Sequence, residues 1–151
     1  MIRGLDFVIP NESGCFLSDM LKPVNYEASR WICEPEESYL VKEKDMIALF
    51  SEHMLSGNAF RDLVNKTPQY LIFAEIKAYP LTGDMAGFDT YEEFLQSACV
   101  LVLLVHDSVY VEMYCKDQDL TKRLYEQAVQ QGYRDVAYKT DETDGRTRMH
   151  V

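Results

Sequence analysis

The stretch CVLVLLVH, residues 99–106, is apolar on both of the faces that alternate along an extended chain. A strand at a protein surface alternates apolar and polar residues, whereas a strand that is covered on both sides is apolar throughout. We therefore expect residues 99–106 to form the middle strand of a sheet that is packed on both faces.

The residues around this stretch predict further strands. His106, Asp107 and Ser108 are typical of a tight turn, and residues 109–116 then alternate apolar with polar or aromatic side chains, which predicts a hairpin. Further segments are strand-like: Gly4–Ile9, with Leu5, Phe7 and Ile9 on one face, Tyr70–Tyr79, Trp31–Cys33 and Tyr39–Val41.

Three segments predict helices. Residues 118–131 repeat apolar side chains at helical spacing between a capping Asp117 and Gly132, and Thr90 with Glu93 has the pattern of a capping box. Phe16–Leu21 forms an apolar helical stripe that Pro23 ends. The region Met46–Val64 is ambiguous: Met46, Leu49, Phe50 and Met54 fit a helix, Gly57 interrupts it, and Phe60, Leu63 and Val64 fit a second one.

Tight turns at Asp107–Ser108 and near Asp144–Gly145 favour antiparallel pairing over parallel units. The expected fold is therefore α+β, with one mixed, mainly antiparallel sheet of about five to seven strands and about three or four helices packed on it. No repeat or linker divides the chain, so residues 1–151 are expected to fold as a single globular domain.

Charge and composition exclude several classes of function. The chain has 25 acidic and 15 basic side chains, a formal charge of -10, which repels nucleic acid and anionic lipid and favours a basic protein partner. Neither an export signal nor a stretch of roughly 20 apolar residues is present, so a cytoplasmic protein without a membrane span is expected. The scattered cysteines and histidines lack zinc-ligand spacing, and phosphate-binding glycine loops are missing, so neither a metal ion nor a cofactor is expected.

Arg3–Glu12, Leu101–Lys116 and Thr140–Val151 together resemble a family of small uncharacterised proteins from spore-forming Gram-positive bacteria. The resemblance extends over nearly the whole chain and implies a bacterial cytosolic setting. It rests on strings of structural residues, so it implies no catalytic site.

A cationic row near the C-terminus is the candidate contact for a ligand or partner. Arg146, Arg148 and His150 would share one face of a terminal strand, where they could receive a carboxylate or phosphate. Charged side chains also protect edge strands from unwanted pairing, and we favour this second interpretation.

Two classes of function are compatible with these observations. The favoured one is a non-catalytic binding or interaction protein, for example an acidic immunity-type partner that neutralises a basic toxin. The alternative is an enzyme whose site assembles from distant residues, namely Cys15, His106, Asp107, Arg146 and Arg148. Cys15 precedes a predicted helix, where a thiolate could be stabilised, but we expect it to be buried and unreactive.

Overall fold

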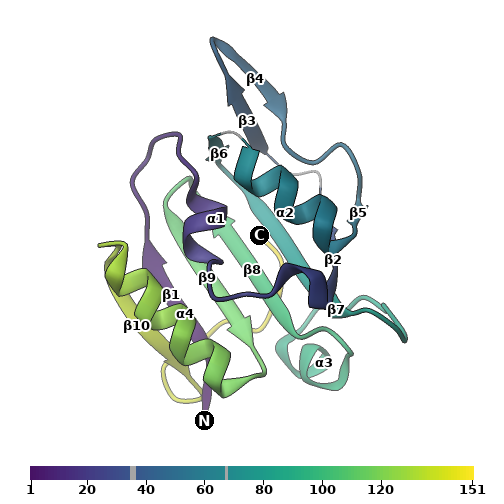
Figure 1. Cartoon of the computed structure of the whole chain (residues 1–151). Coiled ribbons are helices and arrows are strands. Elements are labelled where there is room, and N and C mark those ends of the chain that lie inside the picture. The colour runs from purple at the N-terminus through teal and green to yellow at the C-terminus, as the bar shows by residue number, and fades with distance from the viewer. Residues whose placement is uncertain (35–36, 67) are drawn as a thin grey trace.

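The computed structural model describes residues 1–34, 37–66 and 68–151, and in these a seven-stranded sheet forms the centre of the molecule (Figure 1). Its strands are, in spatial order, β10 (Arg134–Thr140), β1 (Ile2–Val8), β9 (Tyr110–Cys115), β8 (Leu101–His106), β7 (Ala74–Pro80), β2 (Ser29–Cys33) and β5 (Met54–Leu55). All neighbouring pairs are antiparallel. The apolar stretch that was expected to be central is β8, the fourth of the seven strands.

A second sheet of three strands extends from one end of the first, within the described residues. It consists of β4 (Asp45–Ala48), β3 (Ser38–Lys42) and β6 (Gln69–Leu71), again paired antiparallel. The β3–β4 hairpin projects from the body of the molecule at the top of Figure 1.

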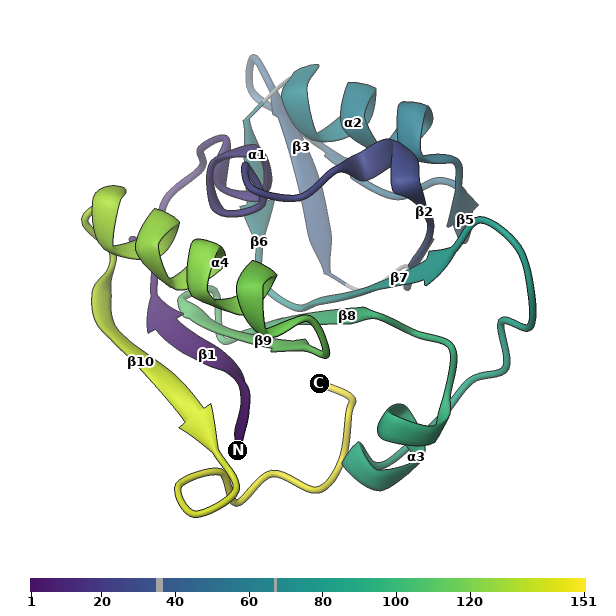
Figure 2. The ribbon, with the colours of Figure 1, turned by 60° about the horizontal axis from the view of Figure 1, so that its bottom comes forward.

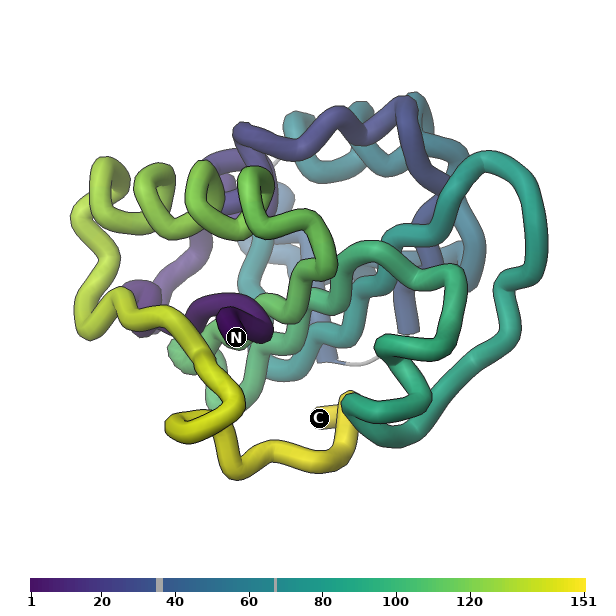
Figure 3. Tube along the Cα trace, turned by 90° about the horizontal axis from the view of Figure 1, so that it is seen from below, coloured from purple at the N-terminus to yellow at the C-terminus, as the bar shows by residue number. Residues whose placement is uncertain are grey.

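The helices are divided between the two faces of the large sheet. Figure 2 shows α1 (Phe16–Met20), α2 (Gly57–Lys66) and α4 (Gln118–Gln130) on one face. On the opposite face lie α3 (Tyr91–Gln96) and the C-terminal residues, which run beneath the sheet towards α3 (Figures 2 and 3). A short 3-10 helix, η1 (Tyr26–Ala28), precedes β2. The α+β class and the antiparallel arrangement are thus confirmed.

Local signals explain where two of the helices begin. The Asp117 carboxylate accepts hydrogen bonds from the amides of Asp119 and Leu120 at 3.0 and 3.2 Å, so it caps α4 as predicted. The Thr90 hydroxyl accepts from the Glu93 amide at 3.2 Å and caps α3, although the Glu93 carboxylate accepts from the amide of Asp89 instead of Thr90. The predicted capping box is therefore present, except that the Glu93 side chain binds the amide one residue before the N-cap.

Two apolar clusters fill the two sides of the sheet. The larger joins the sheet to α1, α2 and α4 and contains Leu5, Phe7 and Ile9 on one face of the first strand, as the sequence predicted. The smaller joins Val102, Leu104 and Tyr114 of the sheet to aromatic residues around α3. Strand β8 therefore contributes alternate residues to both clusters.

Two segments differ from their prediction because tertiary pairing decides them. Met46–Met54 contains β4, a loop and the start of β5 instead of a helix, and the helix α2 begins at Gly57. Gly57 is required there because a Cβ would lie 2.1 Å from the Tyr26 carbonyl oxygen. Tyr70–Tyr79 is divided between β6 and β7, because the amides of Ile72 and Phe73 both donate to the Glu37 carbonyl and the chain passes from one sheet to the other.

The C-terminal part of the chain also differs from its prediction. Residues 134–140 form β10, an edge strand that the sequence did not predict, whereas residues 144–151 make only one isolated bridge, Arg148 with Thr90. There is consequently no hairpin at Asp144–Gly145 and no terminal strand. The physical reason is Met149, which is 0% exposed and draws this segment across the sheet into the smaller cluster.

Candidate interaction sites

Residues 144–151 form a C-terminal strap across the face of the sheet that carries α3 (Figure 3). Two backbone hydrogen bonds of 2.9 Å attach it to the start of α3: the Tyr91 amide donates to the Thr147 carbonyl, and the Met149 amide donates to the Asp89 carbonyl. Between them the side chain of Met149 enters the aromatic cluster. The strap thus covers part of this face of the sheet.

Arg146 connects the strap to the charged residues of the sheet. Its Nε lies 2.6 Å from Oε2 of Glu112, in an ion pair that lacks the direction of a hydrogen bond, and its Nη1 donates to the carbonyls of Arg148 and His150 at 3.1 and 2.9 Å. The other oxygen of Glu112 lies 3.0 Å from Nζ of Lys139. The carboxylate of Glu112 is therefore neutralised by two cations of the same chain.

His150 lies between two carboxylates. Its Nδ1 is 3.1 Å from Oε2 of Glu75, and its Nε2 is 2.9 Å from Oδ1 of Asp89. Burial by itself lowers the pKa of His150, but the hydrogen bonds with Glu75 and Asp89 outweigh it and raise the pKa above the usual 6.5. The two carboxylates therefore favour the charged form of the ring.

The three cationic residues singled out in the sequence thus have different surroundings. Arg146 and His150 form ion pairs with carboxylates of the same chain. The exposed side chain of Arg148 has no partner among the described residues. Because residues 146–151 do not form an edge strand, edge protection is the wrong explanation for the row. Contact of these residues with an external ligand stays a prediction.

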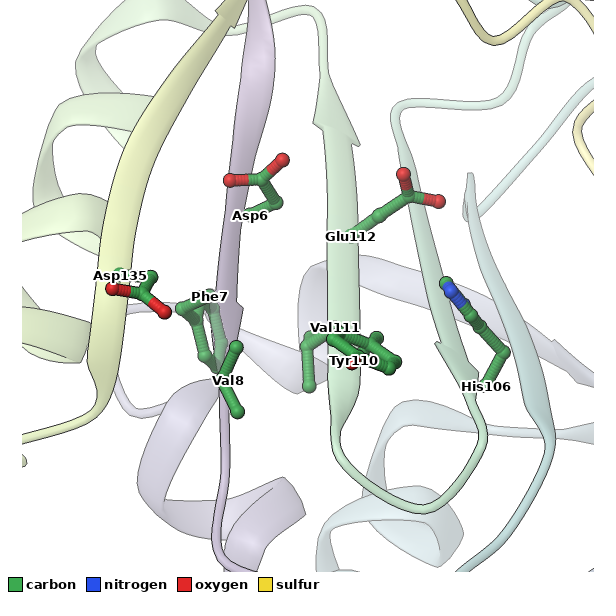
Figure 4. A pocket seen from close by; sticks show the side chains of 8 residues that line it. All are labelled: Asp6, Phe7, Val8, His106, Tyr110, Val111, Glu112 and Asp135. Atoms are coloured by element: carbon green, nitrogen blue, oxygen red, sulfur yellow. The ribbon is translucent and has the colours of Figure 1, made fainter.

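A shallow hollow of about 190 Å³ lies on the same face of the sheet (Figure 4). The carboxylates of Asp6, Glu112 and Asp135 line it with the rings of His106 and Tyr110, which stack with centroids 5.2 Å apart. Nζ of Lys139 lies 3.4 Å from Asp6, so two of the three carboxylates are already paired inside the chain. Its described lining includes neither a cysteine nor a serine.

The residues of the predicted enzyme site do not assemble around this hollow. Its lining includes His106 but not Cys15, Asp107, Arg146 or Arg148. Cys15 precedes α1 and is partly exposed, which corrects the expectation that it is buried. Among the residues that the structure describes, no group of three or more His, Cys, Asp or Glu side chains is placed to hold a metal ion, and no helix is long and apolar enough to cross a bilayer.

The least protected surface is strand β4. All four of its residues are exposed, Met46 and Ile47 to 52% each, and β3 is its neighbour on one side. Its other side has no neighbour among the described residues. Backbone groups that face away from β3 are therefore free to pair with another strand.

The alternation of an antiparallel ladder identifies these groups. The Leu49 amide donates to the Ser38 carbonyl at 2.9 Å, which makes Ser38 and Leu49 a hydrogen-bonded pair. Because hydrogen-bonded and non-bonded pairs alternate along β3 and β4, Met46 and Ala48 direct their amides and carbonyls away from β3. They form a short row of donors and acceptors without partners in the part of the chain that the structure describes.

The sequence did contain a signal for this hairpin. Tyr39–Val41 and Met46–Ala48 are two apolar runs, and the turn between them includes Glu43 with φ of 58°. The signal is weak because no Asn or Gly occupies the turn, so the helical spacing of Met46, Leu49 and Phe50 was the more visible pattern.

The fold and these surfaces define an α+β protein whose antiparallel sheet is closed by helices on one face and by its own C-terminal strap on the other. The chain belongs to the family described as "Protein of unknown function (DUF2691)", which matches residues 2–150. The "Uncharacterized protein YncE" of Bacillus subtilis (strain 168) is 40% identical over 153 residues, covering 100% of both chains. The resemblance expected from the sequence is confirmed. No solved structure matches.

Proposed function

We propose that this protein is a non-catalytic cytosolic interaction protein that recognises a basic protein partner by adding a strand of that partner to β4. The observation that carries the proposal is the unprotected edge of β4, with its apolar side chains and its free backbone groups at Met46 and Ala48. In strand addition, such backbone groups supply the affinity and the alternating side chains supply the specificity.

A comparison of the sheet edges supports β4 as the docking strand. Proteins protect edges by charge, by short length or by a covering segment. β10 carries Arg134, Asp135 and Lys139, β5 has only two residues, and Gln69 of β6 exchanges two backbone hydrogen bonds with Gly14. β4 has four residues, a single charged side chain at Asp45 and no covering segment among the described residues.

Charge complementarity supports a basic partner. The chain carries a formal charge of -10, so its overall field accelerates association with a cationic protein and opposes an anionic one. An immunity-type protein that neutralises a basic toxin is one form of this function. Recognition of this kind needs no catalytic residues.

Two edge variants and one matched control test the proposal. Ile47→Lys places a positive charge on the edge, and Met46→Pro removes an outward amide while leaving the bonds to β3 in place. Val129→Lys is the control, because Val129 is 54% exposed on α4, as exposed as Ile47 but far from β4 in the fold. Proteins recovered from the native cytosol with each variant are quantified by mass spectrometry.

The proposal predicts a basic protein that binds the wild type and Val129→Lys, is lost with both edge variants, and forms cross-links to Lys42 or Lys44 beside β4. Added salt should weaken its binding. Recovery that is unaffected by the edge variants would contradict strand addition. Self-association of the wild type that Ile47→Lys abolishes would show a second copy, instead of a basic partner, on β4.

A further inference from the structure

The C-terminal strap is held by two cationic anchors that differ in their chemistry. An arginine guanidinium is not deprotonated in proteins, whereas a histidine imidazole can gain and lose a proton. Arg146 is paired with Glu112 of β9, and His150 is paired with Glu75 of β7 and with Asp89, the residue before Thr90, the N-cap of α3. The two ends of the strap therefore depend on pH differently.

The geometry around His150 favours a doubly protonated ring. Both ring nitrogens face carboxylate oxygens, at 3.1 and 2.9 Å, and an ionised carboxylate only accepts hydrogen bonds. A neutral imidazole can donate from one nitrogen, so its other nitrogen would direct a lone pair at an oxygen about 3 Å away. Loss of the proton would thus replace one hydrogen bond by a repulsive contact.

Among the described residues, the charged groups found around His150 belong to β7, to the residues before α3 and to the strap. On β7, Oε2 of Glu75 is paired with Nδ1 of the His150 ring, and Nζ of Lys77 lies 3.6 Å from the same oxygen. Asp89 is the second carboxylate, and within the strap Nη1 of Arg146 donates to the His150 carbonyl. Glu75 also accepts from the Val151 amide at 3.3 Å, so the last residue is attached through the same carboxylate.

We propose that His150 is a pH-sensitive latch, which holds the end of the strap closed across the sheet when it is protonated and lets residues 147–151 open when it is neutral. Arg146 keeps the start of the strap attached in both states. Opening withdraws Met149 from the aromatic cluster and uncovers Glu75 and Lys77, two charged residues that are each only 6% exposed in the closed form.

The direction of the pH effect follows from the raised pKa of His150, which its hydrogen bonds with the two carboxylates maintain against desolvation. A group whose pKa is higher in the closed form contributes its full stabilisation below the pKa of the open form, near 6.5. This stabilisation is lost as the pH rises through the higher pKa of the closed form. The strap should thus open more often in mildly alkaline than in mildly acidic solution.

Amide hydrogen exchange of the intact protein tests the latch. The reporter is the Met149 amide, which donates to the backbone carbonyl of Asp89, and the reference is the amide of Leu103 in β8. After division by the intrinsic exchange rate, protection at Met149 should fall several-fold between about pH 5.5 and about pH 8.5, while protection at Leu103 changes far less. The midpoint should coincide with the titration of the His150 ring followed by NMR in the same sample.

Two variants assign the effect. His150→Gln keeps a polar side chain without a titratable charge and should show weak Met149 protection at both pH values. Arg148→Gln alters an exposed neighbour and should keep the wild-type pH dependence. A pH dependence of Met149 protection that persists in His150→Gln would overturn the proposal. So would an exchange midpoint in the wild-type protein that differs from the midpoint of the His150 titration, a comparison that needs no variant.

Discussion

The two faces of the seven-stranded sheet are closed by different physical means. On the helix-covered face, apolar residues of α1, α2 and α4 pack on apolar strand residues, and the rings of Trp31 and Phe60 stack with centroids 4.1 Å apart. On the strap-covered face, an aromatic cluster around α3 adjoins a set of charged strand residues that the strap pairs. The same strands supply both faces through alternate residues.

This difference has a consequence for how each face responds to change. Apolar burial is non-directional and roughly proportional to area, so the helix-covered face should lose stability in proportion to the volume removed. Buried charges need particular partners, because a carboxylate that loses its cation keeps its desolvation cost. The strap-covered face should therefore respond to single partners, with Glu112 and Arg146 as an example.

The largest expected effect belongs to Leu103→Ala on the helix-covered face. Leu103 is 0% exposed in the middle strand, so the change should lower the free energy of unfolding by about 2–5 kcal/mol. Denaturant unfolding measures the loss, with Leu95→Ala on α3 as the control because Leu95 is 51% exposed. A loss below about 0.5 kcal/mol, the size expected at a surface position, would mean that β8 is peripheral.

A smaller loss of unfolding free energy is expected for Met149→Ala, which removes a fully buried side chain on the strap-covered face. Met149 belongs to a terminal strap that can open locally, so we expect a loss of about 1–3 kcal/mol in the same measurement. Exchange at the Met149 position should increase far more than exchange in β8. A loss equal to that of Leu103→Ala would show that the two faces unfold as one unit and remove the distinction between them.

Arg146→Gln should have a similar or smaller effect, about 1–3 kcal/mol, because Glu112 loses a charged partner in a largely buried position. Arg148→Gln is its matched control, two residues away, and should stay within about 0.5 kcal/mol because the Arg148 side chain is exposed. Thermal unfolding of both variants compares them directly. Equal losses would show that the strap depends on total charge and not on the Arg146–Glu112 pair.

Thiol labelling tests the same distinction without a substitution, because it compares the reactivity of Cys15, the residue before α1, with that of the three buried cysteines. Cys15 is partly exposed, whereas Cys33, Cys99 and Cys115 are buried. Burial raises the pKa of all three, that of Cys99 to about 11, so their reactive thiolates are scarce at neutral pH. Brief exposure to iodoacetamide followed by mass spectrometry should label Cys15 first. Labelling of a buried cysteine at the same rate would contradict this description of the core.

Much of the sheet could be predicted because its signals are local. The central position of β8 followed from its two apolar faces, and α4 followed from its cap and its helical repeat. β10 was missed because it mixes charged residues with partly buried apolar ones, and it is held by its pairing with β1 at the other end of the chain. The β3–β4 hairpin was missed because its turn lacks the usual residues.

The α+β class, the middle strand and the acidic charge could be predicted from residue types and their spacing, because these properties depend on short stretches of chain. The tertiary structure alone decided what Arg146 and His150 contact, because Glu112, Glu75 and Asp89 are 34 to 75 residues away along the chain. It also decided that β4 lies at the edge of its sheet, because among the described residues only β3 pairs with it. Local spacing carries no information on such distant neighbours, which is why the fold could be read from the sequence and the candidate site could not.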